Sequence, residues 1–166
     1  MAEYWDGRNV DGSLSGVTLV RGEPIPAGQY HLVCEVLVRH TDGEYLLMRR
    51  DARKEAYPGW YEATAGGSAL CGEEADECIR RELREETGIA DGTFTKVGVC
   101  TTEDTIYHSY LCVTDADKSS VTLQQGETDE YRWISETEFL TFLRTASIPT
   151  QKQRFMPYFR QRGWDV

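Results

Sequence analysis

Residues 67–89 of this 166-residue chain read GSALCGEEADECIRRELREETGI, and they predict a helix from about Glu73 to Thr87. Gly88 comes directly after it, and glycine commonly ends a helix in the left-handed conformation. The acidic first turn suits the positive end of the helix dipole. At about 100° per residue, one face of this helix is an apolar stripe made of Ala75, Cys78, Ile79 and Leu83.

Carboxylates share that apolar face, because Glu82 and Glu86 fall within the stripe and Glu85 lies at its edge. An ordinary amphipathic helix places its charges on the opposite face. Burying a carboxylate is costly unless it is paired with a cation or bound to a metal ion. The three glutamates meet on adjacent turns, and their hard oxygen atoms suit Mg²⁺ or Mn²⁺. From spacing alone, a metal site is only slightly favoured over a salt-bridge network with nearby arginines.

A longer motif shifts that balance towards metal. Its spacing is G-x5-E-x7-R-E-U-x-E-E-x-G-U, with U aliphatic, and its residues are Gly67, Glu73, Arg81, Glu82, Leu83, Glu85, Glu86, Gly88 and Ile89. The stretch resembles the Nudix box at every defined position. The strands and helices expected around the box extend the resemblance to most of the chain.

The resemblance implies an enzyme that hydrolyses a diphosphate linkage with Mg²⁺, or alternatively Mn²⁺, as cofactor. In this family the box binds divalent cations. Glu82, Glu85 and Glu86 match its carboxylate ligands, and Gly66 matches a position whose carbonyl oxygen often binds the metal. A bound cation can neutralise the phosphates and lower the pKa of the attacking water.

Other matching positions have supporting roles in the family. Glu73 and Arg81 match a pair that holds the loop and the helix together, and Gly67 begins the box. A glutamate outside the box often assists catalysis. The acidic segment 126–130 is the best place for it, with Glu127 slightly favoured over Glu130 as a catalytic residue. A solvent-exposed acidic loop is an equal alternative for either residue.

The proton acceptor is not specified by these patterns. A carboxylate can take a proton from the attacking water, and four glutamates are candidates: Glu82, Glu86, Glu127 and Glu130.

A basic cluster lies between a predicted strand and the segment Tyr57-Pro58-Gly59-Trp60. Arg49, Arg50 and Lys54 are its candidates for binding substrate phosphates. A solvated basic loop is an equal alternative. Residues 21–32, 47–50 and 58–60 together resemble the Nudix branch that also contains isopentenyl-diphosphate isomerase.

The remaining pattern predicts an α/β fold of the α+β kind, an α/β/α sandwich with a mixed β-sheet between helices. Strands are expected over 30–39, 44–50, 94–100, 104–113 and 131–134, and further helices from Ser135 and from Thr150. Pro157 is expected to kink or end the last helix. Residues 1–166 are expected to form a single domain, in which 1–28 is an N-terminal hairpin extension.

Composition limits the partners. The net charge of −10 argues against duplex nucleic acid and anionic membranes, so we expect a small-molecule diphosphate as the ligand. Five cysteines without a C-x-x-C pair, and no secretory segment, predict reduced thiols and a cytoplasmic location. A monomer and a homodimer are both compatible with the sequence.

Two alternatives to hydrolysis are open. An isopentenyl-diphosphate isomerase-like proton transfer is disfavoured, because the family's catalytic cysteine would fall within Ala65-Gly66-Gly67-Ser68, which has none, and Cys71 comes too late. A non-catalytic nucleotide-binding Nudix module is disfavoured because no box glutamate is missing.

Overall fold

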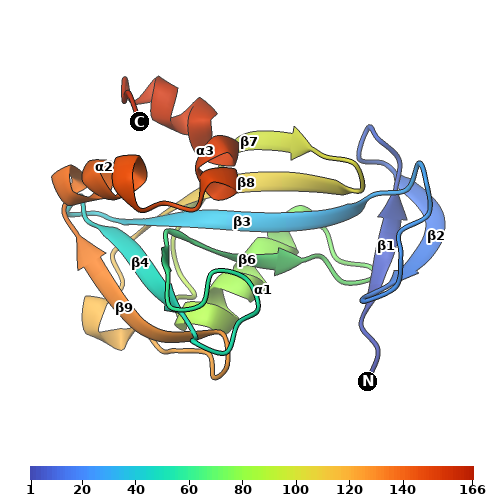
Figure 1. The fold of residues 1–166 in the computed structure, drawn as a ribbon, viewed down its shortest axis with the longest axis horizontal. Helices are drawn as coiled ribbons and strands as arrows, with labels where there is room; N and C mark the ends of the chain where they lie inside the picture. Colours follow the sequence, from blue (N-terminus) through green and yellow to red (C-terminus); the bar gives the residue numbers. More distant parts are fainter.

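The centre of the molecule is a seven-stranded mixed sheet in a computed structural model that describes residues 1–166. A separate two-stranded sheet precedes it (Figure 1). The strands are β1 (Tyr4–Arg8), β2 (Leu14–Val20), β3 (His31–His40), β4 (Tyr45–Arg50), β5 (Tyr61–Glu62), β6 (Thr64–Ser68), β7 (Thr93–Thr101), β8 (Thr105–Thr114) and β9 (Thr128–Ile134). The helices are α1 (Ala75–Thr87), α2 (Glu136–Thr145) and α3 (Pro149–Gln161), with a 3-10 turn at Lys118–Ser120.

Strand β3 organises the sheet. It runs parallel to β8 from the pair His31–Thr105 to the pair His40–Thr114. It is antiparallel to β6, and β4 in turn pairs with β5 and β9. The almost continuous apolar run of β3 fits a strand that is covered on both faces.

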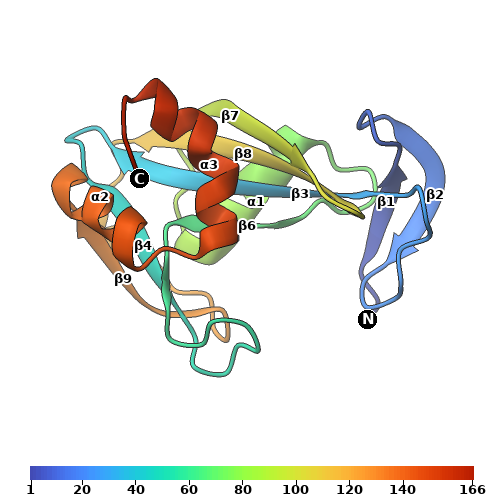
Figure 2. The ribbon, with the colours of Figure 1, turned by 45° about the horizontal axis from the view of Figure 1, so that its top comes forward.

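Helices cover both faces of this sheet, as Figure 2 shows. Helix α1 packs Cys78, Ile79 and Leu83 into one core cluster with β3 and β8. Helices α2 and α3 form the other cluster around Phe139 and Phe155. The expected sandwich with a mixed sheet between helices is confirmed.

The hairpin of β1 and β2 lies beside the end of the main sheet (Figure 2). The backbone N–H of Arg8 donates to the carbonyl of Tyr30 at 2.8 Å. Trp5 is 7% exposed, and its ring meets the ring of His31 edge-on at 4.4 Å between centroids. The hairpin is therefore held in place by main-chain bonding and by a buried aromatic contact.

The last helix differs from the sequence-based expectation. Helix α3 begins at Pro149, with Ile148 as its N-cap, and not at a Thr150 cap, because proline suits the first helical position. It also continues past Pro157 to Gln161, so of the two predicted effects of Pro157 the end of the helix was wrong, and a kink stays a prediction. Phe155 and Phe159 are both 1% exposed, and this packing offsets the backbone hydrogen bond that proline removes.

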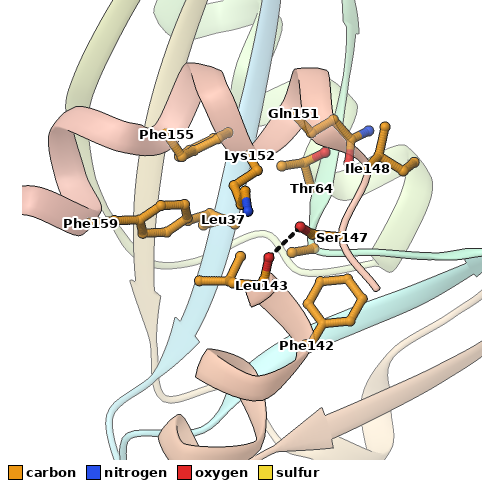
Figure 3. Close-up of a pocket in the computed structure, with 11 residues that line it drawn as sticks. Leu37, Thr64, Phe142, Leu143, Ser147, Ile148, Gln151, Lys152, Phe155 and Phe159 are labelled. Atoms are coloured by element: carbon orange, nitrogen blue, oxygen red, sulfur yellow. Dashed lines mark hydrogen bonds between the residues drawn. The ribbon is translucent and has the colours of Figure 1, made fainter. Parts of the chain in front are cut away.

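Beneath α3 the packing is tight. A space of about 10 Å³ lies among the side chains of α2, α3 and β3, as Figure 3 shows. Ser147 there donates its hydroxyl to the carbonyl of Leu143 at 2.7 Å. The space has room for one water molecule at most, so this part of the fold is core. All five cysteines are free thiols, and no helix has the length and apolar character needed to cross a membrane.

His108 of β8 is expected to make stability depend on pH. Desolvation, with Lys96 and Arg8 nearby, lowers the pKa of His108 from 6.5 to about 4, and its Nδ1 has no hydrogen-bond partner. The folded state therefore favours the neutral ring, so this contribution is complete above pH 6.5 and is lost as pH falls towards 4. Allowing for partial exposure, we expect a loss of about 1 kcal/mol between pH 7 and pH 5.

Urea unfolding at the two pH values measures this loss. His108→Gln should unfold with a smaller difference between pH 7 and pH 5 than the unsubstituted protein. Equal differences in both proteins would contradict the assignment to His108.

Candidate functional site

The glycines before α1 allow the helix to approach the sheet closely. A Cβ atom on Gly67 would lie 2.5 Å from Oε1 of Glu82, and one on Gly66 would collide with the carbonyl oxygen of Cys34. Larger residues at either position would push β6 away from β3 or displace the Glu82 carboxylate. The two glycines thus set the distance between α1 and the central strand.

Arg81 fastens the loop to the helix. Its Nε and Nη2 donate to the two carboxylate oxygens of Glu73 at 2.7 and 2.8 Å, and Nη2 also donates to the carbonyl of Ser68 at 3.1 Å. Glu73 in turn accepts the backbone N–H of Leu70 at 2.9 Å. This bidentate geometry is the strongest form of an arginine–carboxylate pair.

The three glutamates at the end of the box have different surroundings. Glu82 is 14% exposed and accepts a hydrogen bond from Arg81 at 2.7 Å. Glu85 is 47% exposed and lies 3.3 Å from the same guanidinium group. Glu86 makes no ion pair, and its carboxylate accepts only the backbone N–H of Gly66, at 3.3 Å.

Of the three glutamates, Glu86 has the surroundings that most disfavour its charged form. Desolvation, followed by the negative charges of Glu62 and Glu82, raises its pKa well above the ordinary value of 4.5. The pKa of Glu82 is also raised by desolvation, although its bond to Arg81 opposes the shift. Like charges held together in a partly desolvated site are typical of a place that binds a cation.

The donor set suits a hard divalent cation, but its arrangement here is ion-paired. No group of three or more His, Cys, Asp or Glu side chains is placed close enough to hold a metal ion. Arg81 occupies one oxygen each of Glu82 and Glu85. Metal binding therefore requires these two carboxylates to turn from Arg81 towards Glu86, whose oxygens have no cationic partner.

Space for such a turn exists, because two adjoining cavities lie along α1 and β6. The outer cavity has a volume of about 500 Å³ and is lined by Glu82, Glu85 and Glu86 among others. The inner cavity has a volume of about 270 Å³. Four residues line both of them, namely Arg21, Gly66, Glu86 and Glu127.

The candidate phosphate-binding residues separate in the structure. Arg50 and Lys54 line the inner cavity. Arg49 points to the opposite face of β4, where it pairs with Asp129 and Glu130, both at 2.6 Å, and it lines neither cavity. Adjacent residues of a strand face opposite sides, which separates Arg49 from Arg50.

The two acidic candidates outside the box are also separated, because Glu127 lies in the turn before β9 and Glu130 lies within that strand. Glu127 lines both cavities and is hydrogen-bonded to Lys54. Glu130 lies on the other face of the sheet and accepts a hydrogen bond from the hydroxyl of Tyr61.

Four further charged residues at the inner cavity were not identified from the sequence, namely Arg21, Glu35, Glu62 and Arg154. Glu62 is 8% exposed and bonds to Arg50 at 3.1 Å. Glu35 is 5% exposed and forms a bidentate pair with Arg154 of α3, at 2.5 and 2.8 Å. A charged residue inside the apolar run 30–39 was the available signal for Glu35, and no comparable signal marks Glu62 or Arg154.

A model of the NUDIX domain family matches residues 29–159. This range includes the box and the residues of β6 and α1 that line the two cavities. The chain belongs to the Nudix family. An uncharacterised Nudix hydrolase of Listeria monocytogenes is 34% identical over 161 residues, covering 95% of this chain and 90% of that protein. The nucleoside triphosphatase NudI of Klebsiella pneumoniae is 30% identical, covering 76% of this chain and 96% of NudI.

Solved structures show the same Nudix fold. The crystal structure of DR0079 from Deinococcus radiodurans superposes with a TM-score of 0.71 at 20% identity, covering 93% of this chain and 99% of that one. The MutT protein of Methanosarcina mazei superposes with a TM-score of 0.61 at 24% identity, covering 80% of this chain and 95% of that one. The expectation of a Nudix hydrolase of the pyrophosphohydrolase type is confirmed at the level of the family. The resemblance to the isomerase branch stays a prediction.

Proposed function

We propose that this Nudix protein hydrolyses a diphosphate linkage in a nucleoside diphosphate derivative or a related organic pyrophosphate, with Mg²⁺ or Mn²⁺ as cofactor. The observation that carries the proposal is that the three glutamates at the end of the box, Glu82, Glu85 and Glu86, line one cavity. Among them Glu86 is half-buried, lacks any cationic partner and lies near the negative charges of Glu62, Glu82 and Glu127. A divalent cation would relieve this concentration of negative charge.

The residues of the chain have distinct proposed roles. Glu82, Glu85 and Glu86, with the Gly66 carbonyl, would hold the cation, which would neutralise substrate phosphates and lower the pKa of the attacking water. Glu127, at the junction of the cavities, would take a proton from that water. Glu73, Arg81 and Gly67 keep the loop and α1 in register.

The cavities suit a charged, hydrophilic substrate. Only two of the fourteen residues lining the inner cavity are hydrophobic, and only two of the thirteen lining the outer one. Arg50 and Lys54 place positive charge beside this acidic site, where they would contact phosphate oxygens. The likeness to NudI, named a nucleoside triphosphatase, supports a nucleotide-type substrate.

An isomerase-like proton transfer is the weaker candidate. No cysteine lines either cavity, and Cys34 and Cys78 are both fully buried in the core around α1. An isoprenoid tail would also meet few apolar side chains there.

A hydrolysis screen tests the proposal. The protein is incubated with Mg²⁺ and a panel of nucleoside triphosphates, nucleotide sugars, dinucleoside polyphosphates, coenzyme A and isopentenyl diphosphate, and products are identified by mass spectrometry. We expect release of a monophosphate from at least one compound, abolished by EDTA. Folded protein that cleaves none of them would contradict the proposal, and deuterium uptake from solvent into isopentenyl diphosphate would favour the isomerase.

A further inference from the structure

Among the arginines that line the two cavities, Arg21 makes the fewest hydrogen bonds with its guanidinium group. Five cationic side chains line the two cavities: Arg21, Arg50, Lys54, Arg81 and Arg154. Seven glutamates line them as well: Glu3, Glu35, Glu62, Glu82, Glu85, Glu86 and Glu127. An anionic substrate therefore enters a site with an excess of negative charge, so the cations that are free to meet it matter most.

Four of these cations are already engaged. Arg81 is bound to three glutamates, and Arg154 is held bidentately by Glu35 with only 14% of its side chain exposed. Arg50 bonds to Glu62 and to the carbonyl of Ala56, and Lys54 bonds to Glu127.

Arg21 differs from these four cations in its exposure and in the small number of its contacts. Its side chain is 68% exposed, and one nitrogen, Nη1, contacts one carboxylate oxygen of Glu3 at 3.1 Å. A guanidinium group carries five N–H donors, so most of its donors are open to a ligand. Because Arg21 lines both cavities together with Glu86 and Glu127, it borders the place where the cavities join.

The N-terminal hairpin holds Arg21 at that place. Its backbone N–H donates to the carbonyl of Glu3 at 2.9 Å. The neighbouring carbonyl of Tyr4 accepts the N–H of Cys71 at 3.0 Å, and the Asp6 carboxylate accepts the N–H of Gly72 at 2.7 Å. The hairpin is thus bonded directly to the loop that leads into the box helix, and it forms a wall of the cleft.

We propose that Arg21 binds a phosphate group of the substrate next to the diphosphate linkage that is cut, so that the hairpin is part of the substrate site. This inference rests on the proposed function. Arginine suits the role because its planar group can donate two parallel hydrogen bonds to phosphate oxygens. Glu3 holds one nitrogen of the group in position, and the remaining donors would bind the phosphate.

Binding and kinetics of Arg21→Ala test the inference. Binding of imidodiphosphate in the presence of Mg²⁺ is measured by calorimetry. Imidodiphosphate is the probe because its bridging N–H replaces the oxygen of a cleavable linkage. We expect Arg21→Ala to weaken the Kd by roughly tenfold. With a substrate from the hydrolysis screen, KM should rise by a similar factor while kcat changes less than about twofold. Arg21→Lys keeps the charge but not the planar guanidinium group, so its Kd and KM should lie between those of the unsubstituted protein and those of Arg21→Ala.

Arg160→Ala is the matched control. It removes the same charge from an exposed arginine of α3 that lines neither cavity, so its Kd and KM should equal those of the unsubstituted protein. Equal Kd values for Arg21→Ala and Arg160→Ala, or no binding of imidodiphosphate by the unsubstituted protein, would overturn the inference and leave hydrolysis standing. If no substrate is cleaved, yet imidodiphosphate binding depends on Arg21, the proposed function fails and the anion site remains.

Discussion

Glu86→Gln is expected to lower kcat by roughly two orders of magnitude or more while the fold is kept. Glutamine preserves the shape of the side chain but removes the charge that a cation would need. Glu85→Gln should have an effect of the same order, since the charge removed belongs to the same box. Steady-state hydrolysis of a substrate from the screen, with circular dichroism to verify folding, measures both effects.

The stability of Glu86→Gln separates a metal role from a structural one. Because Glu86 is half-buried among other carboxylates and has no cationic partner, its neutral replacement should raise the free energy of unfolding without metal by about 1 kcal/mol. Mg²⁺ should raise the Tm of the unsubstituted protein and not that of the variant. Glu103→Gln is the control, because Glu103 is exposed in the turn between β7 and β8. Unchanged turnover in both Glu85→Gln and Glu86→Gln would refute the assignment of the box glutamates.

Arg154→Met is expected to lower the free energy of unfolding by about 3–5 kcal/mol. It would leave Glu35, which is 5% exposed, as an unpaired charge at the centre of β3. Ser109 donates a single further hydrogen bond to Glu35 at 3.1 Å, which does not replace a bidentate cation. Arg154 also lies over the ring of Tyr107 at 4.2 Å, so part of the loss is packing.

The double variant Glu35→Leu with Arg154→Met is the control for this loss. It removes both charges, and a buried ion pair replaced by apolar residues of similar volume often keeps or gains stability. Most of the lost stability should therefore return in chemical denaturation. If Arg154→Met alone unfolds at the same denaturant concentration as the unsubstituted protein, the pair is not a stabilising element of the inner cavity.

The box helix is the part of the site that was predictable from local sequence. The 3.6-residue period placed Glu82 and Glu86 on the apolar face with Leu83, and in the structure that face packs on β6 and β3. Helix α1 begins two residues later than expected, at Ala75, because Glu74 and Glu77 form the capping box. Strand β6 was missed, since its small residues Thr64–Ser68 show no hydrophobic alternation.

The rest of the cleft was not predictable, because its residues come from distant segments. Arg21, Glu35, Glu62 and Arg154 lie on four different elements or their ends. Of these, only Glu35 has a local signal, as a charge inside an apolar strand, and that signal does not indicate its partner. The pairing of β3 with β6 and of β4 with β5, the docking of the N-terminal hairpin and the packing of α3 on the sheet together bring them to the inner cavity. Conversely, Arg49 and Arg50 are adjacent in the sequence, yet only Arg50 lines the inner cavity.

The sequence by itself determined the family, the mixed α+β class and the helix that carries the box glutamates. The family follows from the resemblance of residues 67–89 to the Nudix box, and the class follows from the order of the expected strands and helices. The shared face of the box glutamates follows from spacing, because residues three or four apart lie on one side of a helix whatever the rest of the chain does. Only the tertiary structure decided that Glu82 and Glu85 share Arg81, that Glu86 has no cation, and that an arginine of the N-terminal hairpin joins the site. These contacts depend on the distances between helices, strands and loops, which the order of the sheet and the packing of the core determine.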